Sequence, residues 1–331
     1  MYRILEKTQF SEKVFKFRIE APRMASHAHA GQFLMVRANE TGERVPFTFA
    51  DWNAEEGWVE FIFMVVGKTT KMLATYEVGD VIRDVTGPLG QPTEMHDGTW
   101  CVIGGGVGLA IAYPVARMLA QSGHEVHVIM GARTKDLLLL VDQFREICDE
   151  DHLHITTDDG SFAEKGVVTA PLERLCEAGA IDQVFAVGPV PMMKFSALTC
   201  EKYDMPIVAS LNPIMVDGTG MCGCCRVEVD GKTKFACVDG PDFDATKVDW
   251  NDLSLRQAAY RAEEAVALEA YEKSCACGGA ASAGAADAVS TCGGAASAGG
   301  GAASTDEGDA GANADAQPAT TQPAATPEEA M

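Results

Sequence analysis

The stretch Trp100–Gly108, WCVIGGGVG, decides the fold of this chain together with the apolar segment that follows it at 111–123, IAYPVARMLAQSG. A short apolar run, a glycine cluster and a long apolar segment predict a buried strand, a tight turn and a helix. Further apolar strands and helical segments then alternate along the chain, the strands at 125–132, 153–159 and 183–189 and the helices at 134–148 and 169–179. This alternation predicts βαβ units on a parallel sheet.

The chain before this stretch has a different pattern. Residues 1 to about 96 contain short alternating runs, such as 13–21, 32–38 and 59–66, that are separated by Gly, Pro and Asn. Such runs predict a small antiparallel barrel. We therefore expect an antiparallel β barrel at 1–96, followed by a parallel-sheet α/β domain at 97–212.

Three further segments complete the chain. A cysteine-rich segment at 213–250 is followed by a predicted helix at 251–273, which Ser254 could cap. The last segment, 274–331, consists largely of Ala, Gly, Ser, Thr and Pro, with seven acidic residues and no Lys or Arg. This composition cannot bury enough apolar surface to offset the entropy lost on ordering, so we predict a disordered tail.

Composition narrows the possible partners and the compartment. The net charge of −22 disfavours nucleic acid and anionic membranes as partners. No apolar run reaches the ~18 residues of a membrane span, and the N-terminus lacks the apolar core of a signal peptide. We expect a cytoplasmic protein, in which clustered cysteines are metal ligands or redox groups rather than disulfides. Four scattered cysteines are predicted to be ordinary buried thiols: Cys101, Cys148, Cys176 and Cys200.

The glycine cluster is the first candidate binding site. It follows a strand and opens a helix, which is the context of a phosphate-binding turn, and comprises Gly104, Gly105, Gly106, Val107 and Gly108. Leu109 occupies the third glycine position of the G-x-G-x-x-G motif, and no acidic residue ends the next strand. A standard NAD-binding Rossmann domain is therefore disfavoured, although a nucleotide turn is not.

Three other strand ends carry candidates for the same site. Arg133 either meets an adenosine phosphate or is simply solvated. Asp158 and Asp159 fit a strand end in a turn better than a catalytic carboxylate pair, and Asp158 remains a candidate cofactor contact. Gly188 and Pro189 follow a strand at its carboxyl end, where open α/β sheets bind their ligands.

Two motifs in the barrel could hold a flavin. The segment ERVPFTF at 43–49 offers a guanidinium for phosphate and a hydroxyl for a flavin ring edge, on Arg44, Pro46, Phe47 and Thr48. The segment FMVVGKTTKML at 63–73 offers backbone amides and hydroxyls to a pyrophosphate, on Gly67, Lys68, Thr69 and Thr70. The alternative interpretation is that the first segment is an ordinary strand and the second a capped helix start, and that neither binds a cofactor.

The cysteine loop DGTGMCGCCRVEVDGKTKFAC at 217–237 is the candidate metal site. Cys222 and Cys225 form a C-x-x-C, and Cys237 follows eleven residues later. Structural zinc usually takes two such knuckles, and the second is missing here. A [2Fe–2S] cluster needs four ligands, so the fourth is Asp217 or Cys224. We prefer Asp217, because adjacent cysteines point in different directions. Cys275, Cys277 and Cys292 lack a fourth partner for a second metal site.

Along the chain, the motifs follow one another as the 43–49 segment, the 67–70 turn, the glycine cluster, Gly188–Pro189 and the cysteine loop. In this order they resemble the motifs of the ferredoxin reductase superfamily over about residues 1–250. The chain looks similar to electron-transfer subunits of dihydroorotate dehydrogenase B. It more closely resembles small subunits of NADH-dependent ferredoxin:NADP⁺ oxidoreductase, also described as sulfide dehydrogenase. The distinguishing feature is Asp217, which stands where the dihydroorotate subunits have a first cysteine and gives Asp-x4-Cys-x2-Cys-x11-Cys.

The resemblance implies FAD, a [2Fe–2S] cluster and NAD(H) or NADP(H) as cofactors. FAD would be held by the 43–49 motif, with Thr48 near its redox-active edge, and by Phe63, Met64, Val65 and the 67–70 turn. Gly104 to Gly108 and Gly188–Pro189 would hold the pyridine nucleotide, with NADH favoured over the NADPH that Arg133 suggests. The cluster would be bound by Asp217, Cys222, Cys225 and Cys237.

The implied function is a relay of electrons from NAD(P)H through FAD to the cluster, inside an electron-bifurcating complex. The implied partners are a larger flavin and iron–sulfur subunit and, through the complex, ferredoxin. The alternatives are an electron-transfer subunit for a dihydroorotate dehydrogenase or a sulfur-reducing partner, a non-catalytic cluster-binding scaffold, and a structural zinc protein.

Overall fold

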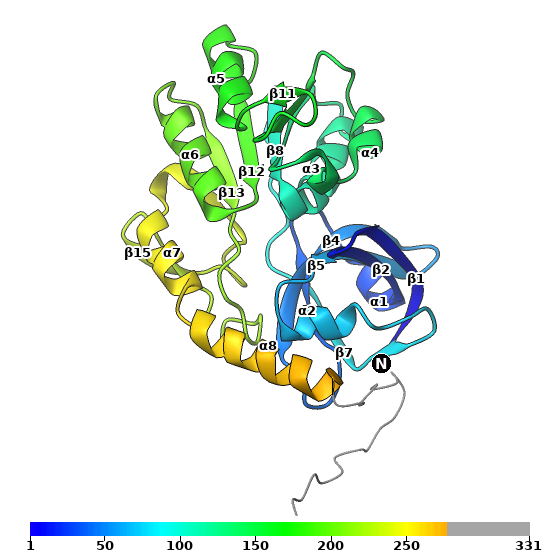
Figure 1. Cartoon of the computed structure of the whole chain (residues 1–331). Coiled ribbons are helices and arrows are strands. Elements are labelled where there is room, and N and C mark those ends of the chain that lie inside the picture. Colours follow the sequence, from blue (N-terminus) through cyan, green and yellow to red (C-terminus); the bar gives the residue numbers. More distant parts are fainter. Residues whose placement is uncertain (277–331) are drawn as a thin grey trace, which may run out of the picture. The chain divides into compact units, whose positions relative to one another are not determined.

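The computed structural model describes residues 1–276 and contains two large sheets (Figure 1). Within these residues, no helix is long and apolar enough to cross a membrane. The first sheet is antiparallel and has the order β6-β1-β2-β5-β4-β3-β7, with β1 (Tyr2–Ser11), β2 (Val14–Glu20), β3 (Phe33–Arg37), β4 (Arg44–Asn53), β5 (Trp58–Met64), β6 (Val81–Ile82) and β7 (Asp84–Leu89). Two short helices, α1 (Pro22–Ala25) and α2 (Lys68–Leu73), accompany it.

The strands of this sheet alternate between buried apolar side chains and partly exposed polar ones. In β2, Phe15, Phe17 and Ile19 are buried, whereas Lys16 and Arg18 between them are partly exposed. Since successive side chains of a strand point to opposite faces, the aromatic residues fill one side of the sheet. The structure confirms the predicted antiparallel barrel.

The second sheet is parallel except at one edge. Its order is β11-β10-β9-β8-β12-β13-β16, with β8 (Trp100–Gly105), β9 (Val126–Ala132), β10 (Leu153–Thr157), β11 (Glu164–Lys165), β12 (Gln183–Val187), β13 (Ile207–Ser210) and β16 (Asp242–Asp244), and only β16 is antiparallel to its neighbour. Four helices connect the strands: α3 (Leu109–Gln121), α4 (Val141–Arg145), α5 (Thr169–Ala178) and α6 (Val190–Glu201).

Helices cover both faces of this sheet, which explains its almost uniformly apolar strands. Leu119 of α3 and Phe144 of α4 belong to the core on one face, and Leu172 of α5 and Met193 of α6 to the core on the other. The strand order places β8 at the centre, with β9 on one side and β12 on the other. The order in which successive strands join the sheet therefore reverses between the parallel strands β8 and β12, and open α/β sheets form a ligand crevice at such a point.

The cysteine-rich segment contains a hairpin, and two helices come after it. The hairpin pairs β14 (Arg226–Val229) with β15 (Lys232–Phe235), and α7 (Trp250–Gln257) and α8 (Arg261–Ala276) follow it. The prediction of one helix capped by Ser254 was wrong. Asp249 caps α7 by accepting hydrogen bonds from the backbone of its first turn, and the Ser254 hydroxyl donates to the Trp250 carbonyl from inside the helix.

The second of these helices, α8, lies against the barrel (Figure 1), where Glu272 pairs with Lys71 of α2. It extends to Ala276, which is beyond the predicted start of the disordered tail at 274. The remainder of that prediction, with Cys277 and Cys292, lies outside the described residues. Of the four scattered cysteines, Cys101, Cys176 and Cys200 are buried as predicted, and Cys148 is half-buried.

The carboxyl group of Asp242 joins three parts of the molecule. Its Oδ2 accepts a hydrogen bond of 2.6 Å from Thr93, which lies between the two sheets in sequence. Ser210, at the end of β13, is a second hydrogen-bond partner. Burial raises the pKa of Asp242 to about 6, and these two hydrogen bonds only partly oppose the rise.

As the pH rises from about 4 to about 6, we expect Asp242 to lower the free energy of unfolding of the protein. In that range the folded protein keeps this proton while the unfolded chain loses it, so folding becomes less favourable by up to about 3 kcal/mol. Melting temperatures measured against pH should therefore decline less steeply for Asp242→Asn than for the parent. Asp136→Asn, which alters an exposed carboxyl, is the control. Parallel profiles for Asp242→Asn and the parent would rule this assignment out.

Candidate functional site

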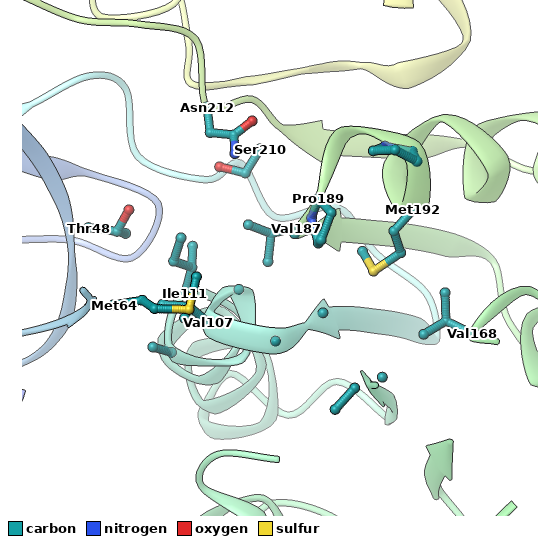
Figure 2. Close-up of a pocket in the computed structure, with 18 of the residues that line it drawn as sticks. Thr48, Met64, Val107, Ile111, Val168, Val187, Pro189, Met192, Ser210 and Asn212 are labelled. Carbon is teal, nitrogen blue, oxygen red and sulfur yellow. The ribbon is translucent and has the colours of Figure 1, made fainter. Parts of the chain in front are cut away.

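The principal cavity of the described chain has a volume of about 1490 Å³ and lies between the barrel and the carboxyl edge of the parallel sheet (Figure 2). Single small-molecule sites usually occupy ~300–1000 Å³, so this cavity has room for more than one extended ligand. The helix α3 packs against β4, and an ion pair of 2.6 Å between Arg117 and Asp51 joins them. The cavity is therefore bounded by elements that are in direct contact.

The barrel forms one wall of the cavity. Phe33 pairs with Thr48 across β3 and β4, and Met35 with Pro46. Thr48 reaches the cavity from the barrel side, opposite Val187 (Figure 2). Six of the predicted flavin-contact residues line the cavity: Pro46, Phe47, Thr48, Phe63, Met64 and Thr70. The other five are not among the lining residues: Arg44, Val65, Gly67, Lys68 and Thr69.

The predicted phosphate turn at α2 is a capped helix start whose hydroxyls already have partners. The Thr70 hydroxyl accepts hydrogen bonds from the backbone amides of Val66 and Gly67, at 3.0 and 3.1 Å. The Thr69 hydroxyl donates to Glu43 at 3.0 Å. Both threonines are buried, so a phosphate at this turn would rely on backbone amides rather than on hydroxyl groups.

The parallel sheet forms the opposite wall. Gly106–Gly108 is a 3-10 turn between β8 and α3, so its backbone amides lie at the N-terminus of a 13-residue helix, where anions are stabilised. The space in front of Gly106 is open, because no atom lies within 4 Å of where a Cβ would be. The other predicted residues on this wall are Gly105, Arg133, Asp158, Gly188 and Pro189, whereas Gly104 is buried behind it.

One part of this wall, the segment 210–215 that begins at the last residue of β13, was not among the residues predicted from the sequence. Ser210 and Asn212 line the cavity next to Pro189 (Figure 2), and Pro213 and Met215 continue the wall. The signal available in the sequence was a Ser-Leu-Asn-Pro run directly after a strand of the parallel sheet, whose carboxyl edge forms the ligand crevice. This segment leads straight into Asp217 and thus joins the cavity to the cysteine loop.

The cysteine loop holds its four predicted ligands as two close pairs. Asp217 Oδ1 lies 3.3 Å from Cys222 Sγ, and Cys225 Sγ lies 3.1 Å from Cys237 Sγ. The first pair is partly exposed, while the second is buried with 2% and 3% of each residue accessible. A [2Fe–2S] cluster takes two protein ligands on each iron, so two pairs of sulfur and oxygen donors fit it. Cys224 is half-buried and also contacts Cys222.

The pKa values of two of these donors, Cys237 and Asp217, are shifted in opposite directions. Burial, followed by contact with Cys225, raises the pKa of Cys237 to about 12, so a metal ion would have to displace its proton. Burial acts to raise the pKa of Asp217 as well. Hydrogen bonds from Thr219 and Cys222 outweigh that effect and lower the pKa, which keeps the carboxylate charged.

The loop also packs tightly against the barrel. Gly218 has a φ of +77°, and a Cβ at this position would lie 2.7 Å from Met35 Cγ and 2.9 Å from Leu89 Cδ1. Glycine is therefore needed both for the backbone conformation and for the close contact with β3 and β7. The contact fixes the loop beside β3, whose Phe33 also lines the cavity.

Comparisons with known families assign three segments of the chain. Residues 2–93 match the oxidoreductase FAD-binding domain, and residues 102–197 match the oxidoreductase NAD-binding domain. Residues 212–249 match the iron–sulfur cluster binding domain of dihydroorotate dehydrogenase B. These matches confirm the predicted cofactors, FAD, pyridine nucleotide and an iron–sulfur cluster of the [2Fe–2S] kind. Fold and site together define a redox subunit of the ferredoxin reductase type.

Individual relatives place the chain more narrowly. A Thermotoga maritima protein described as a dihydroorotate dehydrogenase B (NAD⁺) electron transfer subunit homolog is 48% identical, over 82% of this chain and 95% of its own length. A probable electron transfer subunit of the same enzyme from Methanopyrus kandleri is 32% identical, over 72% and 88%. The chain belongs to this family of electron-transfer subunits, within the ferredoxin reductase superfamily.

A solved structure is similarly close. A chain from the structure of the NADH-dependent reduced ferredoxin–NADP oxidoreductase, studied for flavin-based electron bifurcation, is 46% identical to this protein. The match covers 82% of this chain and 98% of that chain, with a TM-score of 0.77.

Proposed function

We propose that this chain is the small subunit of an electron-bifurcating NADH-dependent ferredoxin:NADP⁺ oxidoreductase. The observation that carries the proposal is the Asp217–Cys222 pair at 3.3 Å. By the resemblance described above, Asp217 is the position at which the dihydroorotate subunits have a cysteine. The 46% identity to a chain of the solved oxidoreductase, over 98% of that chain, supports it. The complete enzyme then requires a larger flavin and iron–sulfur subunit, through which ferredoxin takes part.

The residues of the cavity have separable tasks in this function. When bound, FAD and a [2Fe–2S] cluster would supply the conversion between two-electron chemistry at the nucleotide and transfer of single electrons to a partner. The amides of Gly106–Gly108 hold the nucleotide phosphates, and Gly188–Pro189 orients the nicotinamide. Thr48 offers its hydroxyl to the edge of the flavin ring. Asp217 and the three cysteines hold the cluster beside the barrel.

The first test is to purify the full chain without oxygen, record its visible spectrum and titrate it with NADH and then NADPH. We expect flavin and iron–sulfur bands that NADH bleaches. Bands that neither nucleotide bleaches would favour the non-catalytic scaffold. A colourless protein that contains zinc would overturn the proposal and assign the cysteine loop a structural role.

A second candidate function is electron transfer for a dihydroorotate dehydrogenase. It is favoured by the match of residues 212–249 to the cluster domain of that enzyme and by the description of the Thermotoga maritima relative. The two candidates differ in their partner. Reconstitution with a dihydroorotate dehydrogenase catalytic subunit should give no NADH formation from dihydroorotate if the first proposal is correct, and steady NADH formation if the second is.

Nucleotide preference gives a prediction at Arg133. This exposed side chain lines the cavity directly after β9, where an arginine can bind the 2′-phosphate of NADPH. With NADH as the physiological donor, Arg133→Gln should leave flavin reduction by NADH nearly unchanged. Any reaction with NADPH should slow by about 10-fold to 100-fold, because a charged hydrogen bond contributes about 1.5–3 kcal/mol.

Stopped-flow measurement of flavin bleaching at limiting nucleotide concentration checks this prediction. Arg145→Gln is the matched control, since Arg145 lies on α4 in exposed ion pairs with Asp142 and Glu150. An equal loss with both nucleotides in Arg133→Gln would mean that Arg133 contacts a group that NADH and NADPH share.

A further inference from the structure

The amino edge of the parallel sheet, at the end opposite to the nucleotide turn, carries a cluster of histidines and carboxylates. Val128 donates its backbone amide to the His152 carbonyl at 2.8 Å, and Leu153 pairs with Val128 in the register of β9 and β10. His127 in β9 and His152, which directly precedes β10, are therefore neighbours, and their rings lie 4.4 Å apart between centroids. Glu125 lies two residues before His127, so the pleat directs its side chain to the same face.

The ligand atoms of Glu125, His127 and His152 all lie within 4.8 Å of one another. Ligands on a tetrahedral zinc ion, each at ~2.1 Å, are about 3.4 Å apart, so small side-chain rotations would bring these atoms into range. Glu125 Oε1 and His152 Nε2 are already 3.1 Å apart. His127 is 7% exposed, so it forms the buried side of the cluster.

Two further side chains surround these ligands. Asp149 contacts the second ring nitrogen of His152, with 2.5 Å between Oδ1 and Nδ1. A carboxylate on the far nitrogen is the usual support of a metal-binding histidine, because it fixes the ring and makes it more basic. His154 contacts His127 at 3.5 Å, from Nε2 to Nδ1.

We propose that Glu125, His127 and His152 form a binding site for a divalent cation of the zinc class, with Asp149 as a positioning residue. Two imidazoles and one carboxylate are a donor set that zinc accepts, with a fourth position left to water. The side chains of Glu125 and His152 are 61% and 28% exposed, so an ion can enter from solvent. The site would tie the start of β9 to the start of β10 and is separate from the cysteine loop.

Calorimetric titration of the full chain, loaded with FAD and cluster, with Zn²⁺ tests the proposal. We expect one equivalent to bind in the micromolar range or tighter and to raise the melting temperature. His152→Gln and Glu125→Gln should each weaken binding by about 10-fold or more, and Asp149→Asn by about 10-fold to 100-fold. His124→Gln, a neighbouring histidine outside the ligand set, should bind as the parent does.

X-ray absorption at the zinc edge separates this site from the cysteine loop. Nitrogen and oxygen ligands at ~2.0–2.1 Å are expected, whereas thiolate ligands would appear at ~2.3 Å. Sulfur around the zinc, no zinc bound by the parent, or parental affinity in Glu125→Gln would each overturn the proposal. Glu125 is exposed, so its variant should fold even if His152→Gln does not.

Discussion

Cys237→Ser is expected to abolish the iron–sulfur absorption of the protein while leaving its flavin bound. Cys237 is one of the two buried donors of the cysteine loop, and its sulfur lies 3.1 Å from that of Cys225. A serine hydroxyl is a poor replacement for a thiolate on iron, and Cys237 is only 3% accessible to solvent. The flavin cavity is lined by other residues, so NADH should still bleach the flavin.

Visible and electron paramagnetic resonance spectra of the anaerobic protein, before and after NADH, check this result. The flavin band should bleach, but the signal of a reduced cluster and electron transfer to a one-electron acceptor protein should be absent. Cys148→Ser is the matched control, because Cys148 is half-buried near the end of α4 and outside the loop. A complete cluster signal in Cys237→Ser would remove this residue from the ligand set.

The same spectra decide between Asp217 and Cys224 as the fourth ligand. Both side chains contact Cys222. If Asp217 is the ligand, Asp217→Cys should retain a cluster with an altered signal, and Cys224→Ser should resemble the parent. A lost cluster in Cys224→Ser with an unchanged signal in Asp217→Cys would assign the role to Cys224.

Gly108→Ala is expected to slow flavin reduction by NADH by about 10²-fold at limiting concentration. A Cβ at this position would lie 2.5 Å from the Val187 carbonyl oxygen and 2.9 Å from Gly188 Cα. Both contacts are with backbone, so the turn and the start of α3 must move away from β12. Displacement of the phosphate-binding amides by about 1 Å is enough for a loss of this size.

Gly106→Ala provides the comparison for this variant. Its Cβ would meet no atom within 4 Å, and only its φ of +56° opposes the substitution, at a cost of about 1–2 kcal/mol. Its effect should therefore be the smaller one. Both variants should keep their flavin and cluster bands, which serve as the folding check. A normal rate in Gly108→Ala would show that the nucleotide phosphates bind elsewhere.

Much of the fold was predictable because each part has its own periodicity. The alternation of Phe15, Phe17 and Ile19 with charged residues indicated a barrel strand, and the apolar run at 100–103 indicated a buried parallel strand. The glycine turn was predictable because it lies between such a strand and a helix. The start of α7 was not, because Asp249 and Ser254 are both good capping residues and only the tertiary structure selects one.

The cavity was less predictable than the fold. Its barrel side depends on which face of each strand turns toward the parallel sheet, and this depends on packing that local patterns do not encode. Thus Thr70 reaches the cavity, while the adjacent Thr69 turns away to Glu43. The histidine cluster was missed for a similar reason, since His127 and His152 are far apart in sequence and only the β9–β10 register makes them neighbours.

The segment 210–215 has a consequence for the speed of electron transfer. It lines the cavity from Ser210 to Met215, and Asp217 of the cysteine loop follows two residues later. Tunnelling between redox centres slows exponentially with the gap between them and is fastest through covalent bonds and tightly packed atoms. A continuous backbone, clamped by Gly218 against β3 and β7, supplies such a medium at constant length. If electrons pass from the cavity to the cysteine loop as proposed above, this path keeps its length without any domain motion.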